Sequence, residues 1–111
     1  MEIEREQHGA VTVLAPRGAL TEDAAALFAG RLTDEVAASS GRVAVDCSAA
    51  PYADSAGLEA LVDGADQLER IGQSLRLIAV SPTLRESFDL TGIAGMFEFY
   101  ADVNAAVRSF L

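Results

Sequence analysis

The fold is decided by residues 46–58, which read Asp46-Cys47-Ser48-Ala49-Ala50-Pro51-Tyr52-Ala53-Asp54-Ser55-Ala56-Gly57-Leu58. Just before them, the apolar run Val43-Ala44-Val45 is typical of a short buried strand, which we expect to be parallel to the strand that precedes it. Just after them, apolar residues recur at the spacing of a helix that begins at about Ser55. The segment therefore leads from the carboxyl end of a strand to the start of a helix, where sites gather in open α/β sheets.

Further elements follow on both sides of this segment. Toward the N-terminus, alternating apolar residues around His8-Gly9 predict a hairpin with His8 in a solvated turn, and Thr21 is the expected N-cap of a helix that ends at Ser39-Ser40-Gly41. The second helix is expected to carry its apolar stripe as far as Ile71 and to end at Gly72. The remaining predicted elements are a strand over 75–80, a helix from Ser81-Pro82 to Gly92, an edge strand over 97–100 and a last helix from the cap Asp102 through Phe110. This order predicts an α/β domain with a mixed sheet.

The size and hydropathy of the chain limit its class. A length of 111 residues, of which 50% are hydrophobic, fits one domain over residues 1–111. No stretch approaches the roughly 20 apolar residues of a membrane span, and the charged N-terminus is unlike a signal sequence. We therefore expect no membrane insertion and a cytoplasmic location.

The charged residues and the few potential metal ligands exclude further classes of protein. The net charge is -9, and all eight basic residues are Arg and are scattered along the chain, so direct nucleic-acid binding is not expected. The absence of Lys excludes a P-loop and Schiff-base chemistry. The single Cys47, expected in the core, and the single His8 provide neither a disulfide nor a zinc site, so we expect no metal and no cofactor.

Two carboxylates and a hydroxyl are the candidate chemical groups of residues 46–58. Asp46 ends the predicted strand, and Asp54 precedes Ser55 at the start of the helix, where Ala56 and Gly57 leave the hydroxyl uncrowded. A phosphate on Ser55 would be stabilised by the helix amide groups and dipole and opposed by Asp54. The alternative is structural: Asp54 or Ser55 caps the helix, and Asp46 binds loop amide groups.

A set of ordered motifs now connects these residues to a known family. The motifs are Val45-Asp46-x-Ser48, Asp54-Ser55-Ala56-Gly57-Leu58, Ser81-Pro82-x-Leu84-Arg85, Leu90-Thr91-Gly92-Ile93 and Phe97-Glu98-x-Tyr100. Together they resemble the STAS domains of anti-sigma-factor antagonists over nearly the whole chain. The resemblance implies the STAS fold, with a mixed four- to five-stranded sheet and about four helices packed on it.

The resemblance also implies a function without catalysis. In this family the unphosphorylated protein binds an anti-sigma factor and so frees a sigma factor. The anti-sigma factor is often a serine kinase that phosphorylates the position of Ser55, and a serine phosphatase reverses this. ATP and magnesium would then belong to the kinase. The partner-binding residues implied are Asp54, Ala56, Gly57, Leu58, Gly18, Thr21 and Asp46.

Two positions depart from the family pattern. Thr21 stands where an acidic residue is frequent, so a partner contact or a role in phosphoacceptance is expected to differ. Ala56 stands where many members have a second serine. Ser55 is therefore the one hydroxyl of that motif.

Three other functions are alternatives. A STAS subunit that docks on the ATPase of an ABC-type lipid or organic-solvent transporter has a similar sequence and needs no phosphorylation. An enzyme would use Ser55 as nucleophile, Asp46 or Asp54 as base and His8 as proton shuttle, but the Gly-x-Ser-x-Gly elbow is missing. A small anionic ligand at the helix N-terminus would face acidic surroundings.

Overall fold

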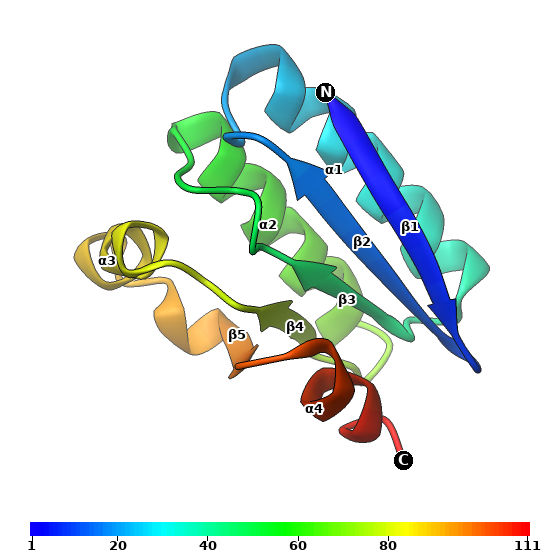
Figure 1. Cartoon of the computed structure of the whole chain (residues 1–111). Helices are drawn as coiled ribbons and strands as arrows, with labels where there is room; N and C mark the ends of the chain where they lie inside the picture. The colour runs from blue at the N-terminus through cyan, green and yellow to red at the C-terminus, as the bar shows by residue number, and fades with distance from the viewer.

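The chain alternates strands and helices, as expected, and the computed structural model describes residues 1–111 (Figure 1). The elements in chain order are β1 (Glu2–His8), β2 (Val11–Arg17), α1 (Glu22–Ala38), β3 (Val43–Asp46), α2 (Ser55–Glu69), β4 (Leu75–Ile78), α3 (Pro82–Thr91), the short 3-10 helix η1 (Ala94–Met96), β5 (Phe97–Tyr100) and α4 (Val103–Arg108).

One five-stranded sheet organises the molecule. Its strand order is β1-β2-β3-β4-β5, in which β1 is antiparallel to β2 and the other neighbours are parallel. The fold class predicted from the sequence, a mixed sheet with four helices, is confirmed. Because β2 to β5 are parallel, their carboxyl ends share one edge of the sheet, where the loops that lead into the helices begin.

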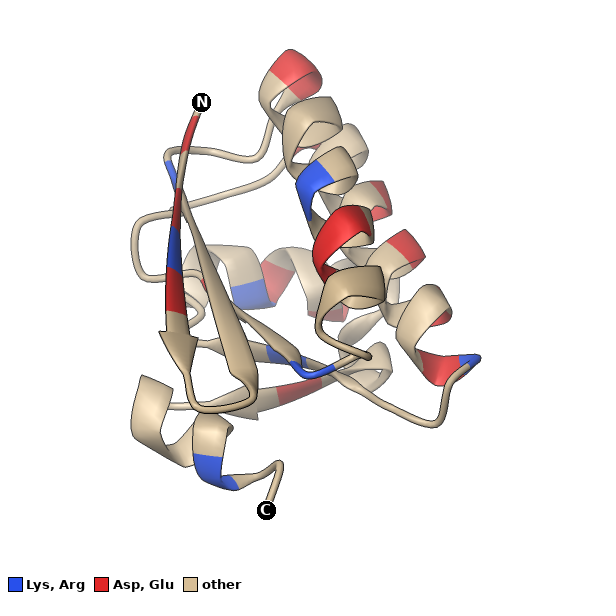
Figure 2. Cartoon of the chain, turned by 90° about the vertical axis from the view of Figure 1, so that its right-hand side faces the viewer, with Lys and Arg blue, Asp and Glu red and all other residues tan.

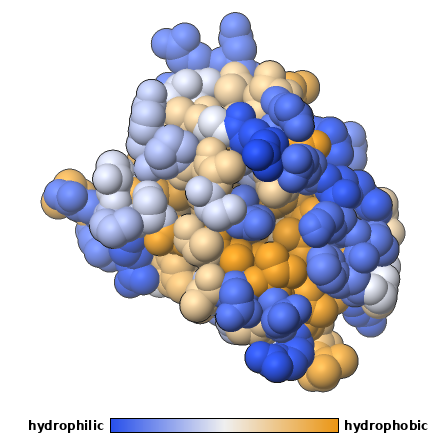
Figure 3. Space-filling view, viewed as in Figure 1, coloured by the Kyte–Doolittle hydropathy of each residue, from blue (hydrophilic) through white to orange (hydrophobic).

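Both faces of the sheet are covered, but unequally. Alternation along the strands sends Leu14, Val45 and Leu77 into a core of 17 buried residues under α1, α2 and α3. On the opposite face, which is nearer the viewer in Figure 1, three strand residues and Ala106 of α4 form a separate cluster of four buried residues. The same view in space-filling form shows a hydrophobic area there, bordered by hydrophilic side chains (Figure 3). The larger core fixes α1 and α2 behind the sheet.

Several element boundaries differ from the prediction. Helix α2 ends at Glu69, so Ile71 lies outside the buried stripe and is 53% exposed. Strand β4 ends at Ile78 because Ala79 adopts a left-handed φ of 55°, which a strand does not accommodate. Helix α4 ends at Arg108, before Phe110.

The structure also corrects two side-chain predictions. Thr21 is the N-cap of α1 by position, but its side chain makes no capping hydrogen bond. His8 was expected in a solvated turn; it is the last residue of β1, and its Nε2 is buried without a hydrogen-bond partner.

Cys47 lies in the core, as predicted. Its side chain is 1% exposed, and burial, with a smaller contribution from the charge of Asp46, raises its pKa to about 12. The thiol is therefore neutral at physiological pH and packs as a small apolar group.

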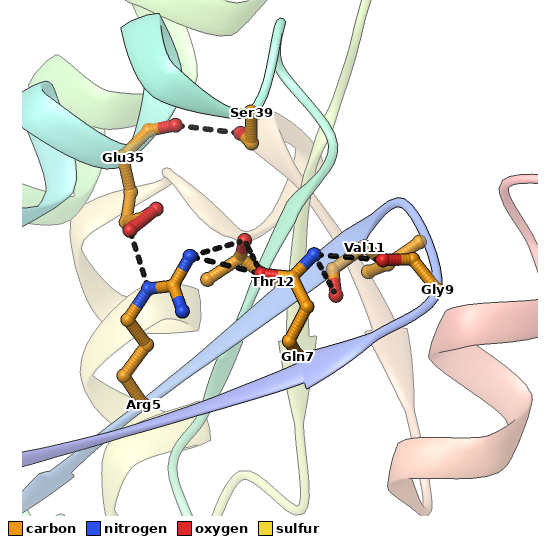
Figure 4. Close-up of polar contacts among 7 residues, drawn as sticks. All are labelled: Arg5, Gln7, Gly9, Val11, Thr12, Glu35 and Ser39. Atoms are coloured by element: carbon orange, nitrogen blue, oxygen red, sulfur yellow. Dashed lines mark hydrogen bonds and ion pairs between the residues drawn. The ribbon is translucent and has the colours of Figure 1, made fainter.

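An ion pair joins β1 to α1 (Figure 4). Glu35 is buried on α1, and its Oε1 accepts a 2.7 Å hydrogen bond from Nε of Arg5, while its Oε2 is buried without a partner. The Arg5 Nη2 group donates to Oε1 of Gln7 at 2.9 Å, and the Thr12 hydroxyl donates to the same oxygen at 3.1 Å. Arg5 therefore supplies the only side-chain partner of a buried carboxylate.

We expect Arg5→Met to lower the free energy of unfolding by about 1–2 kcal/mol, because it leaves the Glu35 charge buried without compensation while the partial exposure of Arg5 limits the loss. Arg17→Met is the matched control. Its partner Glu4 is 51% exposed in the side chain, so its loss is expected below about 0.5 kcal/mol. Urea unfolding of both variants measures the difference, and equal losses would contradict the role given to Arg5.

Candidate functional site

The loops that follow β2 and β3 are joined by backbone hydrogen bonds at the carboxyl edge of the sheet. The Gly18 N–H donates to the Ala49 carbonyl at 2.8 Å, and the Leu20 N–H donates to the Tyr52 carbonyl at 3.0 Å. Leu20 and Ala53 form an isolated parallel bridge. The predicted site residues of the first loop, which include Gly18, are thereby brought against those of the second, although about 30 residues separate them in the sequence.

Asp54 connects the N-termini of both long helices. Its Oδ1 accepts a 3.0 Å hydrogen bond from the Gly57 N–H and so caps α2, which confirms the structural alternative for this residue. Its Oδ2 accepts a 3.1 Å hydrogen bond from the N–H of Glu22, the first residue of α1, whose φ is +45°. Both carboxylate oxygens are therefore engaged, one in capping α2 and the other in holding the start of α1 beside it.

Gly57 permits a close approach between α2 and the loop after β2. It is buried, and a Cβ at this position would lie 2.0 Å from the Leu20 carbonyl oxygen and 2.9 Å from the Ala53 Cβ. No side chain fits into that space. Within the chain, Gly57 therefore has a packing role against Leu20 and Ala53, and its predicted contact with a partner stays a prediction.

Ser55 is the first residue of α2 and is exposed. The side-chain hydrogen bonds of this edge use Asp46, Asp54 and Ser81, and none uses the Ser55 hydroxyl. Because Asp54 occupies the Gly57 N–H, the N–H groups of Ser55 and Ala56 remain the unpaired donors of the first turn. The Ser55 hydroxyl thus makes no hydrogen bond that supports the fold, and it lies beside the two unpaired N–H groups of the first turn.

The remaining predicted residues support this edge. Oδ1 of Asp46 accepts a 2.9 Å hydrogen bond from the Ser48 N–H and stabilises the turn after β3. Ala56 and Leu58 are half-buried, and Leu58 packs against the larger core. Thr21 is half-buried beside α1.

A third loop also contributes, which the sequence analysis missed. The Ser81 hydroxyl donates to the Pro51 carbonyl at 3.0 Å and accepts from the Leu84 N–H at 3.1 Å, so the start of α3 holds the loop before α2. Tyr52 on that loop is 51% exposed. The Ser81-Pro82 pair signalled the helix start, but nothing in the sequence indicated the contact with Pro51.

The comparisons with known proteins now bear on this geometry. The STAS domain family matches residues 2–106. This chain belongs to the STAS domain family. No curated protein sequence matches this STAS domain with significant similarity.

Solved structures share the fold of this STAS domain. A candidate anti-sigma factor antagonist of Thermotoga maritima is 18% identical, with 96% of this chain and 92% of that chain covered and a TM-score of 0.88. An anti-sigma factor antagonist from Mycobacterium paratuberculosis is 23% identical, with 97% and 92% covered and a TM-score of 0.79. The Bacillus cell fate determinant SpoIIAA in its phosphorylated form is 18% identical, with 99% and 100% covered and a TM-score of 0.74.

The STAS domain does not assemble the Ser-His pair of the enzyme alternative. His8 pairs with Val11 at the start of β2, whereas Ser55 follows the loop at the end of β3. Because β2 and β3 are parallel, His8 lies at the amino ends of these strands and Ser55 lies near their carboxyl ends. The proton shuttle proposed for His8 is therefore out of reach of Ser55.

The STAS domain also contains no group of three or more His, Cys, Asp or Glu side chains arranged to hold a metal ion. None of its helices combines the length and the apolar character that a membrane crossing requires. The chemical groups that the carboxyl edge offers are the exposed hydroxyl of Ser55, two unpaired N–H groups and the hydrogen-bonded carboxylates of Asp46 and Asp54.

Proposed function

We propose that this chain is an anti-sigma factor antagonist, a switch protein that is controlled by phosphorylation of Ser55. The observation that carries the proposal is the exposed Ser55 hydroxyl, which has no structural hydrogen bond although Asp54 before it and Gly57 after it are hydrogen-bonded to each other. A hydroxyl that the fold does not use, on a rigid edge, is accessible to another protein's active site. The likeness of the fold to antagonist structures supports the same function.

Phosphorylation of Ser55 would change the surface more than the fold. A phosphoryl group adds nearly two negative charges at neutral pH. The N–H groups of Ser55 and Ala56 and the helix dipole can accommodate it, so α2 remains folded. A docked partner, however, would remove the water from these charges beside the Asp54 carboxylate, and the loss of hydration and the repulsion would weaken its binding.

The partner in this proposal is an anti-sigma factor with serine kinase activity, which also supplies the ATP and magnesium of the transfer. A serine phosphatase restores the free hydroxyl. The chain itself is a regulator, holds no cofactor, acts in the cytoplasm and does not contact nucleic acid. Its surface charge supports the last point, because a net charge of -9 repels phosphate backbones.

The test uses immobilised Ser55→Ala protein, over which a lysate of the native cells is passed, with retained proteins identified by mass spectrometry. The variant keeps the cap on Asp54 and cannot be released by phosphorylation. Recovery of a serine-kinase anti-sigma factor is the expected result. Recovery of a transporter ATPase instead would contradict the proposal and favour a transporter subunit.

A further inference from the structure

A groove follows the junction of α1 and α2. It begins beside Ser55 and extends along the two helices toward their C-terminal halves. It consists of two adjacent hollows of about 320 and 210 Å³, which share Ala29, Ala60 and Asp63 as lining residues. The hollow nearer the start of α2 is bordered by Glu22 and Ala56. At the far end, Nε2 of Gln67 on α2 donates to the Thr33 hydroxyl on α1 at 3.0 Å and connects the two helices.

Small residues form the floor of this groove. Ala29, Ala56, Ala60 and Gly64 line it, and the helices are so close at Gly64 that a Cβ there would lie 2.4 Å from Cδ2 of Leu32. The one large apolar side chain of the lining, Leu32, is only 1% exposed, so the surface of another helix can come close to both α1 and α2.

The rim of the groove is acidic and has no internal counterion. Glu22, Asp34, Glu59 and Asp63 line it, all four are exposed, and none takes part in an ion pair. No Arg is among the lining residues. Figure 2 shows acidic residues recurring along these helices. The groove therefore presents four unpaired carboxylates around a floor that is formed mainly by small residues.

We propose that this acidic groove binds a positively charged helix of the anti-sigma factor. Small and apolar residues of that helix would lie on the alanine floor, and its Arg or Lys side chains would extend to the four rim carboxylates. Since the groove starts at Glu22 and Ala56, beside Ser55, the same partner would cover both sites. The inference rests on the proposed function and specifies the partner's chemistry.

In this arrangement the groove attracts the partner, and Ser55 controls its release. The rim carboxylates are exposed, so they attract the partner in both states of the protein and their effect is screened by salt. The phosphate is added at the centre of the contact, where docking would remove its water. Attraction along the groove is therefore compatible with release by phosphorylation.

The decisive test measures the affinity of the captured kinase for Ser55→Ala protein that also carries Ala29→Arg or Ala37→Arg. Both second substitutions add one positive charge to α1, at the half-buried Ala29 or the exposed Ala37, but only Ala29 lines the groove. We expect Ala29→Arg to raise the Kd about tenfold or more through steric filling and like charge. Ala37→Arg is expected to stay within about twofold of the Ser55→Ala protein.

Asp63→Asn provides a second test that leaves the groove open. It should weaken binding and reduce the dependence of Kd on salt, because one attracting charge is lost. Unchanged Kd and salt dependence in Asp63→Asn, together with equal affinities of Ala29→Arg and Ala37→Arg, would overturn the groove inference while leaving the proposed function intact. Failure of the Ser55→Ala protein itself to bind any serine kinase would instead overturn the proposed function.

Discussion

Gly57→Ala is expected to lower the free energy of unfolding by about 3 kcal/mol, although alanine is the better helix former by about 1 kcal/mol. The added Cβ would lie 2.0 Å from the Leu20 carbonyl oxygen and 2.8 Å from the Leu20 Cβ, and both atoms belong to a loop fixed by backbone hydrogen bonds. Relief requires the loop to move away from α2, which would also pull Glu22 from Asp54. Urea unfolding followed by circular dichroism measures the loss.

Gly30→Ala is the matched control for Gly57→Ala. Gly30 also lies inside a helix, but a Cβ there would meet nothing within 4 Å. This variant should be more stable than the original protein by about 0.5–1 kcal/mol, as helix propensity predicts. If Gly57→Ala were also stabilising, the close packing of α2 against the Leu20 loop would be wrong.

Ser55→Asp is expected to raise the Kd for the captured kinase about tenfold or more, because it places a fixed negative charge at the centre of the contact. The protein should remain folded, since an acidic residue in the first turn interacts favourably with the helix dipole. Ser55→Ala should bind as well as the original protein, because no hydrogen bond of the edge uses the hydroxyl. Surface plasmon resonance gives all three constants.

Ser48→Asp controls for the general effect of one more negative charge. Ser48 is also exposed, on the same segment between β3 and α2, and its backbone N–H already donates to Asp46. We expect Ser48→Asp to bind within about threefold of the original protein, as for an exposed charge outside the contact centre. Equal weakening by Ser48→Asp and Ser55→Asp would point to net charge and would contradict a local switch at Ser55.

Most of the fold could be predicted because local signals agreed with one another. The hairpin at His8-Gly9, the caps Ser81 and Asp102 and the apolar stripes of α1 and α2 all indicate the elements that the structure contains. The end of α2 was less predictable, because Ile71 continues the apolar spacing although the helix ends at Glu69. There the chain turns toward β4, and Ile71 remains exposed.

The site was predictable in its residues but not in their roles. Sequence placed Asp54 and Ser55 at a helix start, yet both could cap it. Only the fold brings the Glu22 N–H, 32 positions earlier, to the second oxygen of Asp54. That contact gives Asp54 the structural role and leaves the Ser55 hydroxyl free. The internal role of Gly57 likewise depends on Leu20, which no local pattern connects to it.

The most direct test of the switch at Ser55 is a phosphotransfer assay with the captured kinase and magnesium ATP. The unmodified protein should gain one phosphoryl group, located at Ser55 by peptide mass spectrometry, and should then elute apart from the kinase on size-exclusion chromatography. The Ser55→Ala protein should gain none and should stay in the complex. Phosphorylation at another residue, or a Ser55-phosphorylated protein that still elutes with the kinase, would contradict the account.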